Sequence, residues 1–491
     1  MKIKSFLILF FSIIYSISYS QVQLGEDILG DAIGDNFGEA MAMSNDGTHI
    51  VIGSRYKDGT LMNSGVTRVY KYENEDWIQI GQDIYGEAQN DFSGTSVSIS
   101  SNGDKIAIGA THNDGTSEDS GHVRIYQFIG STWIQIGNDI DGEAAGDHFG
   151  IEVSLSPTGD RIAIGADFND GSAFNGGHVR VYENIDDEWI QIGQDIDGTY
   201  SNGWIGKSLS LSSNGNRIAI NSPTNLGAGG NGFVQVYEFN GSNWIQIGAN
   251  ISDLNYAFGY SVSLSSDGNT IIIGTINGGS PDVSYVRAYE FNGQNWIQKG
   301  SKLGEEFYDG RFGDSVSISN DGTVIAIGDS RNDGNGFTSG NVQVFRFDNE
   351  VNDWIQIGID IDGSNSYDYC GVKVSLSGTG NRVALGAKFH DGNGISNSGQ
   401  VRVYDFTEFL LSTNDYEGTN LSVYPNPVSE VLIVKSKMQI TRMVLYDLFG
   451  KIVATTFNDN KINCSNLNNQ MYILKITDNN NNHTFKKIMK R

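Results

Sequence analysis

Acidic side chains recur at a fixed place in this 491-residue sequence, shortly before or beside an aromatic residue. Carboxylate oxygens of this kind bind hard cations such as calcium, and a group of them makes a protein face attract cations. The same carboxylates also accept backbone N–H bonds in tight turns, and their regular repetition favours this structural role. The candidates for a metal are Asp35, Asp91, Asp147, Asp309 and Asp368, and a second set in Asp-Gly turns is Asp58, Asp114, Asp170, Asp333 and Asp391.

A second group of candidates consists of aromatic residues that break the regular pattern of the sequence. Exposed aromatic rings stack on sugar rings or anchor a protein partner, so they are weak candidates for ligand binding. The alternative is that they only pack the loops in which they lie. These residues are Tyr200, Tyr256, Phe307, Tyr308 and Tyr367.

The sequence identifies no catalytic residue. The motifs G-x-S-x-G, H-E-x-x-H and G-x-x-x-x-G-K-[ST] do not occur, and no cluster of histidines has the spacing of metal ligands. Cys370 and Cys464 fall in different segments, which predicts two unpaired thiols. No cofactor is therefore expected, apart from the calcium that the aspartates would bind.

The elements that position these residues belong to an internal repeat of about 55 residues. The string W-I-Q-I-G or a close variant begins at six tryptophans, and an aromatic residue beside a small one marks seven units. A third marker, V-x-V-aromatic, also occurs seven times. The tryptophans are Trp77, Trp133, Trp189, Trp244, Trp296 and Trp354; the aromatic markers are Phe37, Phe92, Phe149, Trp204, Phe258, Phe312 and Tyr369.

Each unit contains four strand-like runs, which in the third unit are 153–156, 161–165, 178–182 and 189–193. The second run is continuously apolar, as expected for a strand covered on both faces. A glycine between the first two runs indicates a hairpin with positive φ. These glycines are Gly47, Gly103, Gly159, Gly215, Gly268, Gly322 and Gly380. Four antiparallel strands repeated seven times predict an all-β fold, a seven-bladed β-propeller.

The count of the strands predicts how the propeller closes. The seventh unit has no fourth run of its own, whereas Val22–Ile28 matches the sequence of that run. We therefore expect the N-terminal strand to pair with the third strand of the last blade, which removes exposed strand edges. An open solenoid is the alternative, but it requires polar capping repeats.

The motifs resemble those of a known family. The order D-x-F-G-x-x-V-S-L-S, I-A-I-G-A, N-D-G and G-x-V-R-V-Y is similar to FG-GAP repeats of the integrin α-subunit type, with Phe149-Gly150 and Gly165-Ala166 at the name-giving positions. The resemblance spans about residues 22–406 and implies a propeller used in extracellular recognition. Three positions differ, since Trp204-Ile205 and Tyr369-Cys370 replace Phe-Gly and Asn221 replaces a glycine. The calcium loop D-x-D-x-D-G of some relatives is absent.

The last 71 residues have a different composition, with ten basic and four acidic side chains. Alternating runs at 431–434, 443–446 and 472–476 indicate a small Ig-like β-sandwich. Its motifs resemble the type A sorting domain of the type IX secretion system, which implies contact with the secretion machinery. An ordinary appended Ig-like domain is the alternative. The motif residues are Tyr424, Pro425, Asn426, Pro427, Gly450 and Lys451.

The N-terminus reads as a secretory signal. Lys2 and Lys4 precede an apolar run that is too short for a membrane span, and small residues predict cleavage between Ser20 and Gln21. No later transmembrane segment is expected. The net charge of −26 argues against nucleic-acid binding, which requires basic side chains.

The predicted organisation is a signal peptide at 1–20, a propeller at 21–406, a linker at 407–420 and a sorting domain at 421–491. The expected location is outside the cell or on the outer surface of a Gram-negative bacterium. We expect a non-enzymatic module that binds a glycan or a protein through its acidic loop face. A secreted polysaccharide hydrolase or lyase and a structural surface component are the alternatives.

Overall fold

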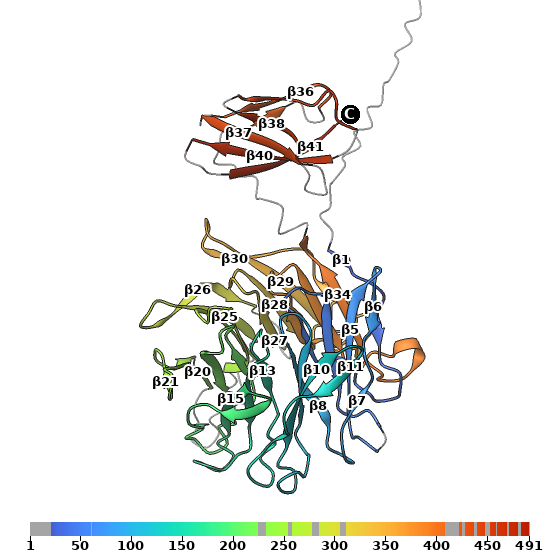
Figure 1. Ribbon diagram of the computed structural model, residues 1–491, viewed down its shortest axis with the longest axis vertical. Coiled ribbons are helices and arrows are strands. Elements are labelled where there is room, and N and C mark those ends of the chain that lie inside the picture. The colour runs from blue at the N-terminus through green and yellow to red at the C-terminus, as the bar shows by residue number, and fades with distance from the viewer. Residues whose placement is uncertain are drawn as a thin grey trace, which may run out of the picture. The chain divides into compact units, whose positions relative to one another are not determined.

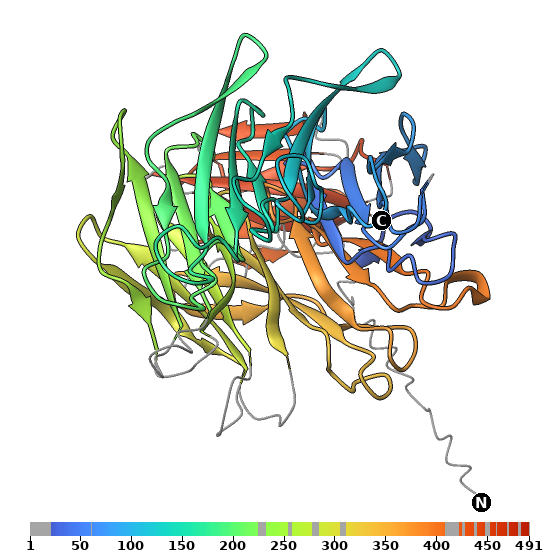
Figure 2. The same ribbon diagram turned by 90° about the horizontal axis from the view of Figure 1, so that it is seen from below.

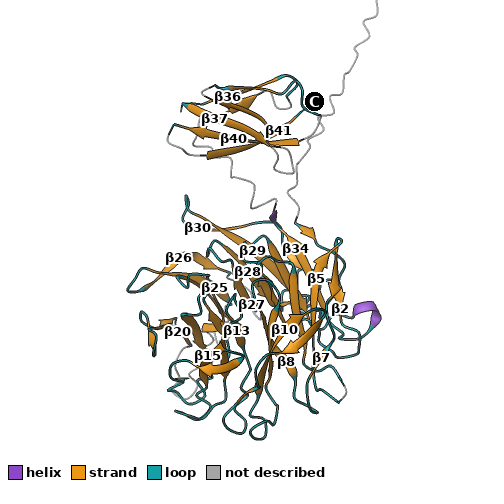
Figure 3. Cartoon of the chain, viewed as in Figure 1, coloured by secondary structure: helices purple, strands orange, loops and turns teal. Residues whose placement is uncertain are grey.

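The computed structural model describes residues 21–59, 61–223, 232–253, 258–276, 284–304, 311–407, 422–424, 428–436, 439–446, 452–457, 459–468, 471–479 and 483–490. The chain divides into two compact units, Met1–Thr407 and Glu408–Arg491. The protein is all-β: the described ranges contain many antiparallel strands, with helical structure at a 3-10 turn, η1 (Gly392–Gly394), and at Thr407 (Figures 1 and 3).

The described part of the first unit forms seven antiparallel sheets. The first strands are β3 (Ala40–Met43), β8 (Ser93–Ile99), β13 (Val153–Leu155), β18 (Leu209–Leu211), β23 (Phe258–Leu264), β27 (Phe312–Ile318) and β32 (Cys370–Leu376). The second strands are β4 (His49–Ser54), β9 (Lys105–Ala110), β14 (Arg161–Ala166), β19 (Arg217–Ser222), β24 (Thr270–Thr275), β28 (Val324–Asp329) and β33 (Arg382–Ala387).

The third strands of the sheets are the longest in most units. They are β5 (Val66–Glu73), β10 (His122–Ile129), β15 (His178–Ile185), β20 (Phe233–Phe239), β25 (Tyr285–Phe291), β29 (Asn341–Asp348) and β34 (Gln400–Asp405). The fourth strands are β6 (Asp76–Gln79), β11 (Thr132–Gln135), β16 (Glu188–Gln191), β21 (Trp244–Gln246), β26 (Trp296–Leu303) and β30 (Asp353–Gln356). Short strands that also pair with third strands are β7 (Ile84–Tyr85), β12 (Ile140–Asp141), β17 (Ile196–Asp197), β22 (Ile251–Ser252) and β31 (Ile361–Asp362).

The N-terminal strands complete the seventh sheet, as the sequence predicted. β1 (Val22–Gln23) pairs with β34 through Val22 opposite Asp405, and β2 (Ile28–Leu29) pairs with the other end of β34. The first strands of consecutive sheets lie side by side, from β3 with β8 to β27 with β32, and β32 lies beside β3. In Figure 2 the colours pass round the unit from blue through green and yellow to orange, which again lies beside blue.

Two features of the predicted blade pattern are confirmed. The second strands are covered on both faces, and Ile162, Ala163 and Ile164 have no exposed surface. The seven hairpin glycines all have positive φ, between 63° and 77°. At Gly215 an added Cβ would lie 2.6 Å from Arg161 Cδ of the neighbouring sheet, so this turn combines a left-handed backbone with a close approach.

In three units the aromatic residue lies one position before the place that the Phe-Gly motif predicted. This corrects the matching of these units to the repeat. The buried residue that precedes the left-handed glycine is Ser93, Ile205 or Cys370, in units two, four and seven. The aromatic residues expected at this place stand one position earlier and have left-handed backbones of their own: Phe92, Trp204 and Tyr369. The glycine fixes the register because its backbone packs against a neighbouring sheet, as Gly206 does against Gly165.

The tryptophans of W-I-Q-I-G join neighbouring sheets, as expected for packing residues. The indole N–H of Trp244 donates to the carbonyl of Ile192 at 2.9 Å, and its ring lies against Gly193. The same bond recurs from Trp77, Trp133, Trp189, Trp296 and Trp354 to Leu24, Ile80, Ile136, Ile247 and Lys299. The repeat therefore fixes the spacing between the sheets.

The second unit consists of two sheets around one core. One sheet contains β35 (Ser422–Tyr424), β36 (Val431–Lys435) and β39 (Lys461–Asn463). The other contains β38 (Ile452–Phe457), β37 (Ile440–Tyr446), β40 (Met471–Asp478) and β41 (His483–Met489). Leu432, Val434, Met443, Leu445 and Leu474 share the core, so the three predicted strand runs are confirmed.

Candidate functional site

The main candidate site is a pocket of about 410 Å³ in the first unit, which we call the central pocket. It is lined by residues at the start of the first strands and by residues that follow β28 and β33. All seven sheets contribute to it. Many of the lining residues belong to the first strands themselves, such as Thr95, Ser96 and Val97 of β8.

The central pocket contains more basic than acidic side chains. Its five cations are Lys207, Arg311, Arg331, Lys373 and Lys388, and its three acids are Glu39, Glu152 and Asp314. Lys388 lies 2.8 Å from Glu39, Lys373 lies 3.4 Å from Glu152, and Arg311 lies 3.3 Å from Asp314. The Lys207 ammonium lies instead 5.4 Å from the ring centre of Trp204 and 6.0 Å from that of Tyr260.

A row of neighbouring aromatic and imidazole rings, which we call the aromatic band, leads to this pocket; its first two ring pairs, starting at Tyr56, meet edge to face. Successive ring centres lie 4.6 to 6.3 Å apart along Tyr56, Phe92, His112, His148, Phe168 and Trp204. Lys207 joins the Trp204 end to the central pocket. At the other end, Tyr56 lines a neighbouring hollow of about 610 Å³ that shares Lys388 and Phe389 with the pocket.

Burial controls the protonation of the groups in the band. It lowers the pKa of His112 and of His148, and the His148 pKa is lowered further by the neighbouring His112. Burial also raises the pKa of Asp167 to about 6, although the positive charge of Lys207 opposes the shift. Within the described part of the chain, Asp167 Oδ1 has no hydrogen-bond partner, and it lies 3.9 Å from His148 Nδ1. The Asp167 carboxylate is therefore held in a poorly solvated place.

The predicted aspartates that the structure describes are hydrogen-bonded in turns. Asp91 accepts from the backbone N–H groups of Glu87 and Ala88, and Asp147 from that of Ala144. A side chain from the following loop also bonds to each, Asn113 Nδ2 to Asp91 and Asn169 Nδ2 to Asp147. Burial raises the pKa of Asp147.

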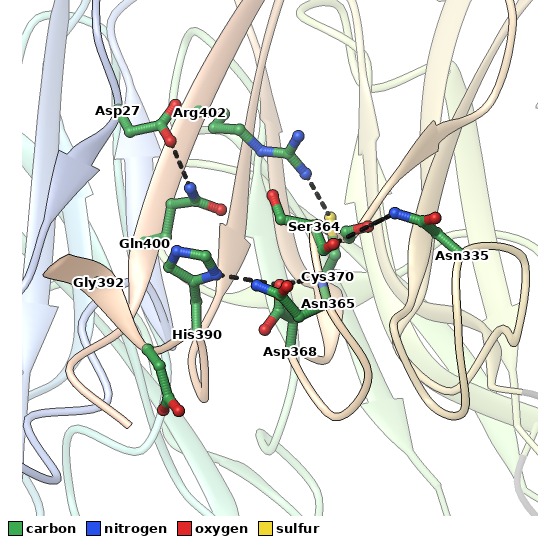
Figure 4. Close-up of polar contacts among 12 residues, drawn as sticks. Asp27, Asn335, Ser364, Asn365, Asp368, Cys370, His390, Gly392, Gln400 and Arg402 are labelled. Atoms are coloured by element: carbon green, nitrogen blue, oxygen red, sulfur yellow. Dashed lines mark hydrogen bonds and ion pairs between the residues drawn. The ribbon is translucent and has the colours of Figure 1, made fainter. Parts of the chain in front are cut away.

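The other two described aspartates have cationic or imidazole partners. Asp35 accepts from Ala32 N–H and lies 2.8 Å from Lys57 Nζ, while burial raises its pKa. Asp368 accepts from Asn365 N–H and lies 3.0 Å from His390 Nδ1 (Figure 4). Asp309 lies outside the described residues. The four described candidates thus take part in local bonds and do not converge on one point.

The Asp-Gly turns show the same structural use of carboxylates. In each of them the aspartate accepts a backbone N–H bond from a residue five or six positions later. The pairs are Asp58 with Asn63, Asp114 with Asp119, Asp170 with Asn175, Asp333 with Thr338 and Asp391 with Asn397.

The predicted aromatic candidates do not line the central pocket where they are described. Tyr200 is 44% exposed, packs on Phe233 at 6.0 Å and lines a hollow of about 60 Å³. Tyr367 is 58% exposed and packs on Phe337 at 5.4 Å. Tyr256, Phe307 and Tyr308 lie outside the described residues.

The structure also brings together two clusters that the histidine spacing did not indicate. One contains Glu87, His122 and Asp139, and the other contains Glu143, His178 and Asp195. Burial, followed by the nearby Arg180, lowers the pKa of His178 to about 4. The available signal was the repeat itself, because corresponding members of the clusters are 56 residues apart, the interval between Trp133 and Trp189.

The remaining predictions concern the thiols and the termini. Cys370 and Cys464 are free and buried, as expected. Tyr424 ends β35 and is 46% exposed, whereas Ser20, Pro425, Asn426, Pro427, Gly450 and Lys451 lie outside the described residues. Gln21 Oε1 accepts a bond from Ile359 N–H at 3.0 Å. No helix in the described ranges is long and apolar enough to cross a membrane.

Comparisons with solved structures find distant similarities. A proposed 6-phosphogluconolactonase from Bacteroides uniformis ATCC 8492 is 13% identical, with a TM-score of 0.47 over 66% of this chain and 85% of that chain. Another from Bacteroides fragilis NCTC 9343 is 11% identical, with a TM-score of 0.46 over 66% of this chain and 84% of that chain. No curated protein sequence matches this chain.

The C-terminal unit has a clear family match. Residues 422–491 match the family described as "Secretion system C-terminal sorting domain". This confirms the resemblance that the sequence showed in this segment and implies an interaction with the secretion machinery. The protein therefore carries a type IX sorting domain and is exported to the outer-membrane surface or secreted.

Proposed function

We propose that the first unit is a seven-bladed FG-GAP-like β-propeller and that it serves as a binding module of an exported, surface-displayed protein. The seven antiparallel sheets, the ring of first strands and the pairing of β1 with β34 support this assignment. In this organisation a signal peptide covers 1–20, the propeller covers 21–406, a linker covers 407–420 and the sorting domain covers 421–491. The ligand binds at the central pocket.

The observation that carries this proposal is the charge of the pocket. The chain has a net charge of −26, yet the central pocket holds five basic and three acidic side chains. A basic hollow in an acidic protein attracts anions to one place, because the surrounding negative charge disfavours them elsewhere. Lys207 is the group best placed to meet a ligand, since its described contacts are with aromatic rings.

The neighbouring rings favour a glycan with acidic groups as the ligand. The rings of the aromatic band are half-buried, except for the more exposed Tyr56, so their open edges and faces supply apolar contact beside the basic pocket. Aromatic surfaces bind sugar rings, and lysine or arginine binds carboxylate or sulfate groups on them. A pocket shared by several sheets also holds its ligand rigidly, because each sheet is fixed by its neighbours.

A glycan array with the full chain tests this function, with neutral and uronic-acid or sulfated oligosaccharides side by side. Binding is expected only with the acidic ones. Lys207→Gln should weaken it about tenfold, because it removes a charge-assisted contact. Lys105→Gln is the matched control, since Lys105 contacts backbone carbonyls of the 158–159 hairpin and should leave affinity unchanged.

Three results would contradict this assignment. Equal binding of neutral and acidic glycans would remove the role of the pocket charge, and an unchanged affinity of Lys207→Gln would place the ligand elsewhere. Binding to a protein and to no glycan would show that the ligand belongs to a different class. Release of shortened or unsaturated sugars from the same panel would instead favour the hydrolase or lyase.

Export by the C-terminal domain is tested separately. Removal of residues 421–491 should leave the protein in the periplasm, because the sorting signal lies there. Normal surface display of the truncated protein would contradict this role.

A further inference from the structure

Two buried histidines in the first unit, His122 and His178, each face a pair of carboxylates. His122, in the second sheet, is 1% exposed, and neither of its ring nitrogens has a hydrogen-bond partner among the described residues. Its Nδ1 lies 3.5 Å from Asp139 Oδ2 and 4.0 Å from Glu87 Oε2. Unpaired ring nitrogens are rare in protein interiors, since burying a polar group without a partner is unfavourable.

The third sheet has a similar cluster, but there Arg180 Nε and Nη2 already donate to Asp195 Oδ2 at 3.1 and 2.9 Å. His178 is also 1% exposed, and its Nδ1 lies 3.9 Å from Glu143 Oε2 and 4.0 Å from Asp195 Oδ2. In both clusters one ligand atom of each residue lies within 4.8 Å of the other two. The three residues come from the loop before the first strand, the first position of the third strand and the position before the short fifth strand.

We propose that the cluster of the second sheet, Glu87, His122 and Asp139, is a binding site for a divalent transition metal such as Zn²⁺. Imidazole and carboxylate groups are ligands of this ion, with metal–ligand distances of about 2.0 to 2.2 Å. Ligand atoms on a tetrahedral ion of this size lie roughly 3.4 Å apart, close to the separations of 3.5 to 4.0 Å found here. An ion at this place would connect three chain segments of one sheet.

The neighbouring side chains leave the proposed ligand atoms available in the second sheet. Arg124 lies 3.3 Å from Glu87 Oε1, and Gln135 donates to Asp139 Oδ1 at 2.6 Å. The other oxygen of each carboxylate, Glu87 Oε2 or Asp139 Oδ2, is the one near His122. The two carboxylates and the arginine together leave one negative charge, which favours a cation over an anion.

Two other sheets show which contacts form when the position of His122 holds another residue. In the first sheet, Val66 takes the place of His122, and Arg68 bridges Asp31 and Asp83 at 3.0 and 2.8 Å, while Lys57 also pairs with Asp31. In the seventh sheet, Gln400 hydrogen-bonds directly to Asp27 at 2.6 Å (Figure 4). The histidine is therefore required neither for the ion pair nor for a hydrogen bond to the acid.

These natural alternatives provide the variants for a test on the full chain. His122→Val and His178→Val copy the first sheet, and His122→Gln copies the hydrogen-bonding side chain of the seventh. Zinc content after dialysis and calorimetric titration with Zn²⁺ should give one equivalent for the wild type and for His178→Val, and none for His122→Val or His122→Gln. His390→Asn is a second control and should retain one equivalent, because His390 already pairs with Asp368.

Thermal unfolding gives a second readout, since an ion that binds only the folded state raises the melting temperature. A chelator should lower the melting temperature of the wild type and leave that of the folded His122→Val variant unchanged. Equal zinc binding by the wild type and His122→Val would overturn the proposal. So would a wild type that binds no zinc at micromolar concentration.

Discussion

The two ends of the seven sheets differ in how strictly they repeat. At the hairpin end a serine Oγ accepts the backbone N–H bond of the residue five positions later, in every sheet. The serines are Ser44, Ser100, Ser156, Ser212, Ser265, Ser319 and Ser377. At the pocket end the corresponding positions hold different side chains, such as Glu39, Lys207 and Asp314. Strict repetition thus identifies residues needed for the fold, and departures from it identify candidates for function.

The largest loss of stability is expected when a residue that repeats in the sheets is replaced. Trp244→Ala should lower the free energy of unfolding by about 3 to 5 kcal/mol, because a large buried ring and its bond to Ile192 are lost. Chemical denaturation monitored by circular dichroism measures this change. Ile245→Ala changes the exposed neighbour and should have an effect below about 0.5 kcal/mol. Equal effects of the two changes would contradict the packing role.

The repeating part of the molecule could be predicted from the sequence because its pattern depends on local rules. Alternation, apolar runs and turn glycines each reflect one strand or one turn, and the missing seventh W-I-Q-I-G predicted the pairing of Val22 with the last sheet. The register at Phe92 and Trp204 differs from the predicted one because the left-handed glycine, and not the aromatic residue, holds the recurring place in the sheet. The glycine is fixed by contact with a neighbouring sheet, which a single unit does not reveal.

At the pocket end, replacing Asp167 should have the next largest effect on stability. Because burial raises its pKa to about 6, the folded protein binds a proton at a pH where the unfolded chain has released it. The stability that the protonated group contributes is therefore present below about pH 4 and is lost as the pH rises through 6. Asp167→Asn should stabilise the protein at pH 7 by about 2 to 4 kcal/mol.

The pH dependence provides the control, since the difference in unfolding free energy between Asp167→Asn and the wild type should disappear near pH 4. Denaturation curves at pH 4, 5, 6 and 7 follow the change. A variant that is less stable than the wild type at pH 7 would show that the charged carboxylate contributes a favourable contact.

A smaller effect is expected where one sheet departs from the repeat inside its core. Asn221 stands where the other second strands have glycine, and its side chain donates to Gly259 O and accepts from Ser208 N–H, both at 2.8 Å. Asn221→Gly restores the repeat but leaves two buried groups unpaired, so it should destabilise the protein by about 2 kcal/mol. The mirror change, Gly165→Asn, should be more harmful, because a Cβ there would lie 2.0 Å from Gly206 O. A stabilising Asn221→Gly would contradict this explanation.

The pocket end was harder to predict, because its residues come from different sheets and approach one another only when the sheets are arranged in a ring. Lys207 and Lys388 are far apart in the sequence and line one pocket, and each ring of the aromatic band comes from a different loop. The clusters around His122 and His178 combine positions 17 and 35 residues away in the chain, so they lack the short spacing of a familiar metal motif. The sequence predicted an acidic loop face as the binding site, but it did not indicate the basic side chains that converge in the central pocket.

The smallest effect is expected at a loop residue that looked functional in the sequence. Tyr367 lies outside the lining of the central pocket and contacts Phe337 edge to face at 5.4 Å. Tyr367→Ala should therefore leave the affinity for an acidic glycan within twofold and reduce stability by about 0.5 to 1 kcal/mol. Phe92→Ala is the comparison, because it interrupts the aromatic band between Tyr56 and His112 and should weaken binding. Titration of both variants with one oligosaccharide separates the two regions, and a stronger loss for Tyr367→Ala would place the ligand on the outer loops rather than at the central pocket.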